Sequence, residues 1–411
     1  MLKLRPFRAL AGTLLLLASI LSATAQTLTV EQKTEVLDGI DKIVMERAFV
    51  PNIDLKLWPE HLAKHREAID KAEQQGDFVR EVNRALREFG FSHIRLRTPT
   101  AAEARQRTSV IGVGLTARPE ADGLVVLAVT PKSPAEELGV KPGWKIVEVD
   151  GKVPENPAVL TGDEGTDVAL KIKDEAGEVR EITLKRQRFS VFRPDTLTWA
   201  DEESAVLRIQ SFSRGYNQKA IEELMAEAAK AKYLVLDLRS NGGGLVNNLQ
   251  HLLSLLMPPD TQIGAFISRS TFDAYVKEKP GPSPTVEAIA EWSSRKYKTS
   301  KKAVEPFAGK VAVLVNRGSA SASEICAAAL RENLHAPLVG ARTAGAVLAS
   351  VYGKLPQGFE IQYPISDYVT AQGRRLEANP LDPDAEAAGG KTEDGKDPGI
   401  EKALEMLKAG G

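Results

Sequence analysis

The segment that decides the fold is "VAVLVNRGSASASE", which runs from Val311 to Glu324. Its apolar first half predicts a buried strand, a Gly/Ser turn follows, and the alanine-rich stretch from Ala322 to Arg331 predicts a helix. Ser321 stands at the N-terminus of that helix, where unpaired backbone N–H groups and the helix dipole favour negative charge. That position suits a nucleophile that forms an oxyanion intermediate. Ser321-x-x-Glu324 is also the pattern of a helix capping box, and the spacing alone favours the cap.

A second glycine-rich turn precedes this segment in the chain. The apolar run from Tyr233 to Leu238 predicts a buried strand, Ser240 to Gly244 reads "SNGGG", and Val246 to Leu256 predicts a helix. The bare backbone of such a turn lets N–H groups approach a ligand closely, although a tight strand–helix turn without a ligand is an equal alternative. Two such turns after two buried strands would lie side by side at one edge of a parallel sheet, where the sites of α/β proteins gather.

These two units place residues 200–370 in an α/β fold. Ala205 to Gln210 predicts a further strand of the same sheet. Residues 270–305 are polar and predict an insertion or lid. A stretch rich in Pro, Asp and Gly, at 380–399, precedes a last short helix from Ile400 to Leu407.

Residues 107–188 change to short alternating apolar runs, which predict strands. The stretch "SPAEELGVKPGWKIVEVDGK", from Ser133 to Lys152, resembles a PDZ domain of the permuted bacterial type. Thr166 to Lys171 and Val179 to Lys185 predict a hairpin. The interval between Gly151 and Gly165 is short and contains two prolines, so the helix that forms one wall of a PDZ peptide groove should be shortened or missing. The peptide-binding role is weakened accordingly.

The chain before this domain reads as helical. His61 and His65 lie four residues apart, which raises the question of a metal pair, but Leu62 occupies the position where a zincin has glutamate. We therefore expect both histidines on a solvated helix face. A short strand is predicted from Ser92 to Leu96. The predicted helices are Val30 to Phe49, Trp58 to Glu73 and Asp77 to Phe89.

Residues 1–25 have the pattern of a secretory signal peptide. A basic start is followed by an apolar run from Leu10 to Leu21 and by small residues at Ala23 to Ala25. The apolar run is short for a membrane span, and a retained membrane anchor is the alternative. We expect the mature chain to begin near Gln26 and to work outside the cytoplasm.

Composition excludes several classes of protein. The 411 residues include 54 Lys and Arg against 55 Asp and Glu, so the net charge of −1 provides no field that would attract nucleic acid or an acidic membrane. The single cysteine, Cys326, excludes an intrachain disulfide and any multi-cysteine zinc or iron–sulfur site. We expect Cys326 to be a buried small apolar residue rather than a reactive thiol. No metal and no organic cofactor is expected.

Taken in chain order, the motifs resemble the tail-specific, or C-terminal processing, serine protease family, whose members include the tricorn core. A helical leader, a PDZ domain, "LDLRSNGGG", "NRGSASASE" and "LDPDAE" with a C-terminal helix occur in the family's order over nearly the whole mature chain. The resemblance implies that Ser321 is the nucleophile and that the backbone N–H groups of Gly243 and Ala322 form the oxyanion hole. It implies an α/β multidomain chain with a helical domain at 26–100, a PDZ domain at 107–188 and a ClpP/crotonase-like core at 190–411.

One departure from the family decides the mechanism. The better-known branch uses a Ser–Lys dyad, with the lysine in a "T-x-G-K" segment after the nucleophile. Here Thr343 to Ala346 reads "TAGA", and Ser350 replaces the glutamine that usually follows. A methyl group cannot take a proton from a serine hydroxyl, so this chain cannot carry out the Ser–Lys reaction.

The tricorn-like branch instead uses a Ser–His pair before the PDZ domain and a late glutamate. This chain has "FGFSHIRL", with Ser92 and His93, and "GRRLEANPLDPD", with Glu377. The resemblance implies His93 as general base, with Ser92 and Glu377 as a relay that orients the imidazole. Histidine suits that task because its pKa lies near working pH. A structural histidine on a strand is the alternative.

The resemblance implies a secreted or periplasmic serine endopeptidase that acts through an acyl-enzyme on unfolded or C-terminally exposed polypeptides. One alternative is a catalytically silent scaffold protein that keeps the fold, which the missing lysine favours and the Ser92-His93 and Glu377 motifs oppose. A crotonase-type acyl-CoA enzyme would share the core fold but would explain neither a PDZ domain nor an export signal. The oligomeric state does not follow from the sequence.

Overall fold

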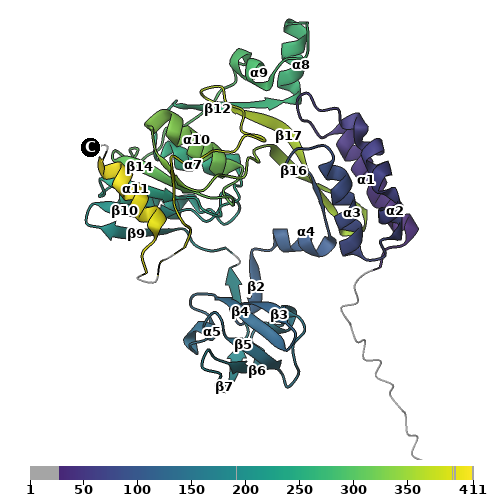
Figure 1. Ribbon diagram of the computed structural model, residues 1–411, viewed down its shortest axis with the longest axis vertical. Helices are drawn as coiled ribbons and strands as arrows, with labels where there is room; N and C mark the ends of the chain where they lie inside the picture. The colour runs from purple at the N-terminus through teal and green to yellow at the C-terminus, as the bar shows by residue number, and fades with distance from the viewer. Residues whose placement is uncertain (1–26, 191, 391, 393–394, 410–411) are drawn as a thin grey trace, which may run out of the picture.

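The computed structural model describes residues 27–190, 192–390, 392 and 395–409 (Figure 1). The secretory signal expected at residues 1–25 lies outside them. Over the described ranges, no helix has both the length and the apolar character needed to cross a membrane. The ribbon shows a larger α/β body above a smaller β body, with α4 (Pro99–Gln106) between them (Figure 1).

The larger body is built around a six-stranded sheet with the strand order β18-β15-β14-β11-β10-β9. All neighbouring strands are parallel except β9 and β10. The predicted strands at Tyr233 to Leu238 and Val311 to Asn316 are the neighbours β11 and β14, so the two glycine-rich turns do lie at the same edge. The strands are β9 (Thr196–Asp201), β10 (Ser204–Arg208), β11 (Tyr233–Asp237), β14 (Lys310–Val315), β15 (Leu338–Gly340) and β18 (Ala385–Glu386).

Helices cover both faces of this sheet. Because side chains alternate along a strand, Leu234 and Leu236 of β11 pack with α6, α7 and α10, whereas Val235 packs with α11. The C-terminal helix is held by more than apolar contact. The guanidinium of Arg239, which follows β11, makes a bidentate pair with Asp397 (2.7 and 3.0 Å). The helices are α6 (Gln218–Ala228), α7 (Val246–Ser254), α10 (Ala322–Leu334) and α11 (Pro398–Ala409).

A second sheet joins distant parts of the chain. Its centre is β17 (Glu360–Thr370), which pairs antiparallel with β1, β12 and β16. The strand predicted from Ser92 to Leu96 begins later, at Arg95, because His93 has a φ of 60° and turns the chain before the strand starts. The other members are β1 (Arg95–Arg97), β12 (Gln262–Ser268), β13 (Tyr297–Lys298) and β16 (Ala349–Lys354), with a 3₁₀ turn, η3 (Pro356–Gly358), before β17.

Three N-terminal helices pack against one face of the second sheet. Leu96, Ile361 and Tyr363 of that sheet belong to the same apolar core as the helices, including Trp58 and Phe78. The predicted helices are confirmed, each two or three residues shorter at its C-terminal end than expected. They are α1 (Val30–Glu46), α2 (Trp58–Lys71) and α3 (Gln75–Arg87), with a 3₁₀ turn, η1 (Leu55–Leu57), before α2.

The expectation that His61 and His65 share a solvated face is wrong for His61. Its ring is buried, 4.6 Å from that of Phe89, because position 61 lies one turn after the buried Trp58 on the apolar stripe of α2. His65 is more exposed and lies 3.2 Å from Glu88 Oε1. Among the described residues, no cluster of three or more His, Cys, Asp or Glu side chains could hold a metal ion.

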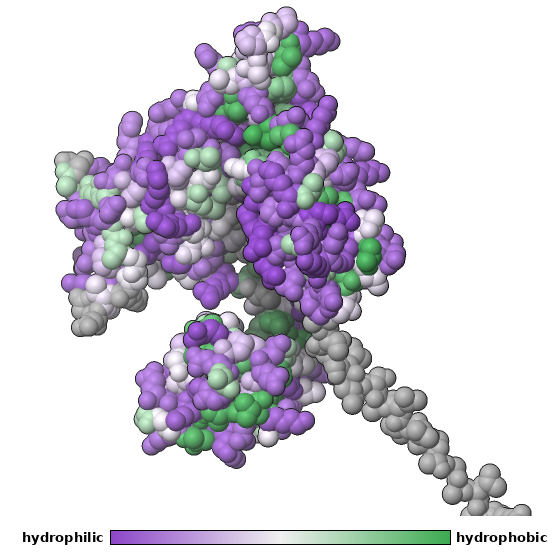
Figure 2. Space-filling view, turned by 45° about the vertical axis from the view of Figure 1, so that its right-hand side comes forward, coloured by the Kyte–Doolittle hydropathy of each residue, from purple (hydrophilic) through white to green (hydrophobic). Residues whose placement is uncertain are grey.

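The smaller body is a five-stranded antiparallel sheet in the order β3-β4-β5-β6-β7. It is joined to the rest by the β2–β8 ribbon, and apolar side chains lie on its surface (Figure 2). The predicted hairpin is present as β6 and β7, and the interval with two prolines holds only a 3₁₀ turn, η2 (Pro157–Leu160). The other elements are β2 (Ser109–Gly112), β3 (Leu115–Glu120), β4 (Gly123–Val129), α5 (Pro134–Glu137), β5 (Lys145–Val149), β6 (Asp167–Lys173), β7 (Val179–Lys185) and β8 (Gln187–Ser190).

The polar segment 270–305, predicted as an insertion or lid, forms a helical arm. It consists mainly of α8 (Arg269–Glu278) and α9 (Val286–Trp292), which extend β12 at the top of Figure 1. Its base is tied to the N-terminal region, because Arg269 donates to the carbonyl of Ala48 (2.7 Å).

The anchoring of α11 can be tested by removing Asp397. One carboxylate oxygen accepts from the amides of Gly399 (3.0 Å) and Ile400 (3.3 Å) and so caps the helix, while the same group pairs with Arg239. Asp397→Ala should lower the free energy of unfolding by about 1–3 kcal/mol, measured by urea denaturation at pH 7. Lys408→Ala is the control, because the Lys408–Asp201 pair at the other end of α11 is exposed and should contribute about 0–1 kcal/mol. Equal losses would show that Asp397 does not anchor the helix.

Candidate active site

Ser321 lies at the sharp turn between β14 and α10. Its backbone has φ 56° and ψ −119°, a conformation that non-glycine residues rarely adopt and that survives only where the surroundings impose it. The amide of Ser321 donates to the carbonyl of Ala346 (2.9 Å). The next amide, that of Ala322, has no hydrogen-bond partner among the described residues, so the helix offers a free N–H beside the Ser321 side chain.

A buried carboxylate holds this turn. Glu324 is 0% exposed, and its oxygens accept from the hydroxyl of Thr343 (2.6 Å) and from the amides of Gly345 (2.7 Å), Ala346 (3.0 Å) and Ser321 (3.2 Å). The capping interpretation of Ser321-x-x-Glu324 is thus realised by the glutamate. It does not compete with a chemical role for Ser321, because Glu324 engages the Ser321 backbone amide.

The second glycine-rich turn lies directly against Ser321. A Cβ atom on Gly243, whose φ is +88°, would stand 2.7 Å from the carbonyl oxygen of Ala320 and 2.8 Å from Ser321 Cβ, so only glycine fits. The Gly243 amide donates to Asn241 Oδ1 (3.0 Å). Of the two implied oxyanion donors, the Ala322 amide is therefore free, whereas the Gly243 amide has an internal partner. A bulky substitution at Gly243 would also displace the turn around Ser321, so it cannot report on the amide alone.

Ser92, His93 and Glu377 form one hydrogen-bonded chain, although Glu377 comes 285 residues after Ser92. Glu377 accepts from the amide of Ser92 (2.7 Å) and from its hydroxyl (2.8 Å). Ser92 Oγ lies 2.6 Å from Nδ1 of His93. The Ser92 hydroxyl has a single proton to donate. Because it donates this hydrogen bond to Glu377, its oxygen accepts one from Nδ1–H of His93. Nε2 of His93 is then unprotonated and has the lone pair that a general base requires.

The surroundings keep His93 neutral. Burial lowers the pKa of His93 below its ordinary value, and the negative charge of Glu377 offsets only part of this. The imidazole should therefore be free of its second proton at neutral pH, which is the state in which it can accept one.

One loop, residues 343–347, links Ser321 to this relay. The carbonyl of Ala346 accepts from the Ser321 amide, and the amide of Val347 donates to Glu377 Oε2 (2.8 Å). Within the described residues no hydrogen bond joins His93 to Ser321. Such contacts are often long in unliganded sites and shorten when substrate binds. The structure thus brings the Ser321 turn and the relay to the two sides of one peptide group, that between Ala346 and Val347.

Comparison with known proteins finds relatives among peptidases. Residues 203–387 match peptidase family S41. The carboxyl-terminal-processing protease of Synechocystis sp. is 30% identical over 288 residues, which are 67% of this chain and 62% of that protein. The carboxy-terminal processing protease CtpA of Bacillus subtilis is 28% identical over 287 residues, which are 67% of this chain and 56% of that protein. The match places residues 203–387 of the chain in peptidase family S41.

The matches have limits of length and of identity. The chain spans less than two thirds of either relative. Among solved structures, the tricorn protease aligns over 92% of this chain and 37% of its own, with a TM-score of 0.56 and 16% identity. Mature CPAF in complex with lactacystin aligns over 92% and 98%, with a TM-score of 0.50 and 14% identity. These structural likenesses concern the mixed α/β fold that this chain shares with them.

In this chain, the two residues that depart from the Ser–Lys branch, Ala346 and Ser350, make structural hydrogen bonds. Ala346 contributes its backbone to the link between Ser321 and Glu324. Ser350 Oγ accepts from Gln362 Nε2 (2.8 Å). Within the part of the chain that the structure describes, no lysine forms a hydrogen bond with Ser321.

Cys326 and two further groups that could carry chemistry, His251 and Tyr297, lie in packed surroundings. Cys326 is fully buried, and burial raises the pKa of its thiol, so it is an inert core residue. His251 is also buried, with its two ring nitrogens near the hydroxyl of Tyr216 (2.9 Å) and the carboxylate of Glu222 (3.1 Å). The hydroxyl of Tyr297 donates to the carbonyl of Val246 (2.6 Å).

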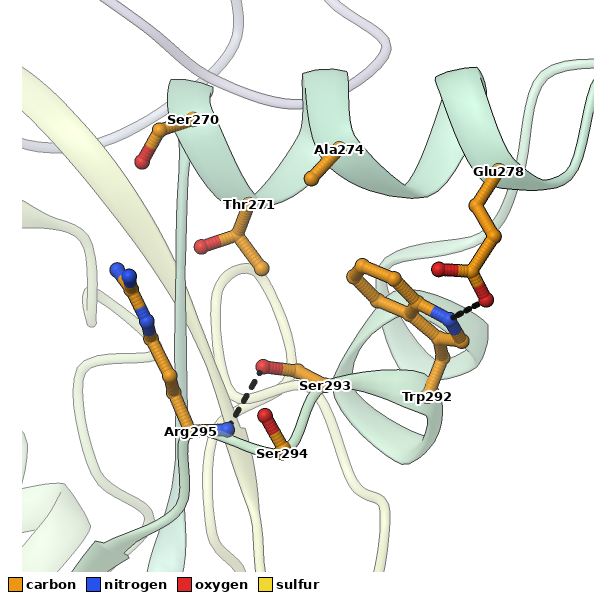
Figure 3. Close-up of a pocket in the computed structure, with 8 residues that line it drawn as sticks. All are labelled: Ser270, Thr271, Ala274, Glu278, Trp292, Ser293, Ser294 and Arg295. Atoms are coloured by element: carbon orange, nitrogen blue, oxygen red, sulfur yellow. Dashed lines mark hydrogen bonds between the residues drawn. The ribbon is translucent and has the colours of Figure 1, made fainter.

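A pocket of about 380 Å³ opens between α8 and α9 (Figure 3). Trp292 points toward Glu278 and donates to it (2.8 Å), and its ring packs edge-on against Tyr275. The lining is Ser270, Thr271, Ala274, Glu278, Trp292, Ser293, Ser294 and Arg295, which includes none of the residues around Ser321. Tyr275 and Trp292 therefore serve packing within the arm.

The residues that hold the site in place do not stand out in the sequence. Its pattern indicates only a helix cap at Glu324 and a glycine-rich turn at Asn241. Asn241 is fully buried, and its carbonyl accepts from the Ala320 amide (3.1 Å) and from Ser323 Oγ (2.8 Å), which ties the two turns together. The available signal was a pair of polar residues, Glu324 and Asn241, amid small residues at the ends of buried strands, where burial without partners would be costly.

Replacing Glu324 tests whether its carboxylate organises the Ser321 turn. Glu324→Gln should place an amide NH₂ against N–H or O–H donors, which costs about 1–3 kcal/mol of stability. The rate at which a fluorophosphonate labels Ser321 should fall about 10²-fold, because small displacements in a reacting constellation have large effects.

Glu81→Gln is the matched control, since Glu81 is also a buried carboxylate but pairs with Arg80 and Arg84 on α3. It should lower the unfolding midpoint without slowing the labelling. Unchanged labelling of Glu324→Gln would show that the loop keeps its geometry without the carboxylate.

Proposed function

We propose that this chain is an exported serine endopeptidase that hydrolyses peptide bonds of unfolded or C-terminally exposed polypeptides through an acyl-enzyme. The observation that carries the proposal is the hydrogen-bonded chain from Glu377 through Ser92 to Nδ1 of His93, beside the strained turn of Ser321. The motifs of the tricorn-like branch support the same assignment. The proposal does not use a Ser–Lys mechanism, because Ala346 stands at the position of the lysine and its methyl side chain cannot accept a proton.

The proposed reaction gives each group a defined role. Nε2 of His93 takes the proton from Ser321 Oγ as the oxygen attacks the peptide carbonyl, and the imidazolium then gives that proton to the leaving amine. Glu377, through Ser92, holds the ring orientation and stabilises the transient positive charge. Water, deprotonated by the same imidazole, then attacks the acyl ester, and the imidazolium returns the proton to Ser321 Oγ as the new carboxyl group of the product is released.

The tetrahedral oxyanion would be received at the N-terminus of α10. The Ala322 amide is free to donate at once, and the Gly243 amide has to share or exchange its bond to Asn241 Oδ1. Binding of substrate would thereby complete the oxyanion hole. No metal and no organic cofactor takes part in this scheme.

The remaining parts of the chain receive roles consistent with this activity. We assign the smaller body, whose short η2 leaves little wall for a peptide groove, to a PDZ domain that admits substrate. We assign residues 26–100 to a helical domain that supports the second sheet, and residues 190–411 to a ClpP/crotonase-like protease core. The signal expected at residues 1–25 would direct the protein to the periplasm or the exterior.

The base can be tested by substitution and by pH. His93→Ala and Ser321→Ala should each abolish turnover of an unfolded protein substrate almost completely, because members of such a unit depend on one another. In the unchanged enzyme, activity should rise with pH through an inflection below about 6.5, the ordinary histidine value, because burial lowers the pKa of His93 and the neutral ring is the active form. Glu377→Gln removes the charge that raises this pKa, so its inflection should move lower and its rate should fall.

Labelling by a fluorophosphonate separates this proposal from a silent scaffold protein. An activated Ser321 should label in the unchanged protein and not in Ser321→Ala. Absence of labelling in the unchanged, folded protein would favour the scaffold, and near-normal activity of His93→Ala would place the base elsewhere.

A further inference from the structure

The sheet that follows His93 has two chemically different faces. Leu96, Ile361 and Tyr363 point to the core beneath the N-terminal helices. Because side chains alternate along strands, Arg95 and Arg97 of β1 lie on the opposite face. The register continues that face across the sheet: Arg95 pairs with Gln362 and then Tyr352, and Arg97 with Glu360 and then Lys354. We call this surface the arginine face, defined by Arg95, Arg97, Arg105, Tyr352, Lys354 and Glu360.

The single carboxylate of the arginine face is already occupied. Glu360 is 3% exposed and forms a bidentate pair with Arg105 of α4 (2.6 and 2.7 Å). Arg105 also lies over the ring of Tyr352, 3.8 Å from its centroid. This pair satisfies Arg105 and Glu360 together, and it leaves the remaining cations of the face without a neutralising charge.

Arg95 and Arg97 have no acidic partner among the described residues. Nε of Arg97 is buried and lacks any hydrogen-bond partner in that part of the chain, although its guanidinium lies 5.7 Å from the Tyr352 centroid. Burial, and then the charge of Arg97, lower the pKa of Arg95. A buried donor without an acceptor costs free energy, which a bound anion would recover.

The arginine face adjoins the proposed relay. Arg95 is two residues after His93, so their Cα atoms are at most about 7 Å apart. An extended peptide advances about 3.3 Å per residue, so a group held here belongs to a substrate residue within a few positions of the cleaved bond. Arg95 and Arg97 also belong to a strand that is paired with β17, so their backbone positions are fixed in the absence of ligand.

We propose that Arg95 and Arg97 form a carboxylate-binding subsite, which takes a carboxylate of the polypeptide substrate a few residues from the cleaved bond. The fork of a guanidinium matches a carboxylate in shape and forms charge-assisted hydrogen bonds with it. The identity of the ligand as a polypeptide rests on the proposed function. The carboxylate can come from the C-terminus of the substrate or from an acidic side chain.

Three peptides that differ only at one side chain and at the C-terminal group distinguish these two sources. The first ends in a free carboxylate and has no acidic side chain, the second ends in an amide and contains one glutamate, and the third ends in an amide with glutamine in place of that glutamate. Each is assayed for kcat/KM with the unchanged enzyme, Arg95→Gln, Arg97→Gln and the control Arg66→Gln. Arg66 is an exposed arginine of α2 that pairs with Asp70, remote in sequence from the face.

The subsite should affect only peptides that carry the recognised carboxylate. For these, Arg95→Gln and Arg97→Gln should each lower kcat/KM about 10- to 100-fold, whereas the third peptide and the Arg66→Gln enzyme should be unchanged. Raising the salt concentration from 50 to 500 mM should weaken the same reactions and spare the third peptide. The first or the second peptide, whichever responds, identifies the source of the carboxylate.

Binding of the same peptides to Ser321→Ala keeps this test separate from the proposed function. If the unchanged enzyme cleaves none of them, the proposed function is in doubt, but the subsite still predicts that Ser321→Ala binds a carboxylate peptide more tightly than the third peptide and loses that preference with Arg97→Gln. Equal effects of the arginine substitutions on all three peptides, or none on any, would overturn the subsite and leave Arg97 as packing against Tyr352.

Discussion

The site depends on a buried negative charge that has no cationic partner among the described residues. Charge of this kind is tolerated only where hydrogen bonds replace the lost water, and the carboxylate of Glu324 receives four of them. Three of the donors are backbone amides, so the carboxylate fixes main chain rather than mobile side chains. The strained conformation of Ser321 and the course of the 343–347 loop are therefore set by one group, which lies one helical turn beyond Ser321.

That loop explains how a chain without the dyad lysine can still be organised around the same turn. In the Ser–Lys branch this loop would supply the base itself. Here it acts through its backbone, with Ala346 bonded to the Ser321 amide and Val347 bonded to Glu377. In the proposed mechanism, the base then comes from another part of the fold. Ser92 and His93 come close to Glu377 because β1, which follows them, pairs with β17. That strand ends at Thr370, shortly before Glu377. In the proposed mechanism, the second sheet and the helices packed on it thus position the base.

The sequence was informative where structure follows from local pattern. The apolar runs that end in Ser/Gly turns predicted β11, β14 and the helices after them. A parallel strand that is buried on both faces is almost continuously apolar, and this pattern is visible in the sequence. It was uninformative where partners are far apart in the chain. β17 was not foreseen, since Pro364 and Asp367 break its apolar alternation, and Asp367 is buried only because Arg375 pairs with it (2.7 and 2.8 Å). For a related reason, the burial of His61 is not predicted: it depends on Phe89, which lies just after the end of the next helix. The candidate residues Ser321, His93, Ser92 and Glu377 came from family motifs, and no spacing argument could have shown that Ser92 and Glu377 touch.

A serine between carboxylate and imidazole has a consequence for the working pH. In a triad with direct contact, the carboxylate adjoins the ring and strongly favours its protonated form. Here Ser92 Oγ occupies that place, 2.6 Å from Nδ1, and Glu377 lies behind it. The added distance weakens the attraction between Glu377 and the imidazolium, so burial prevails and the pKa of His93 is lowered. The hydroxyl still fixes the tautomer, because it donates to Glu377 and accepts from Nδ1–H. Orientation of the base is thus separated from its basicity, and the ring stays neutral and ready to accept a proton at a pH where a directly paired histidine would hold one more tightly.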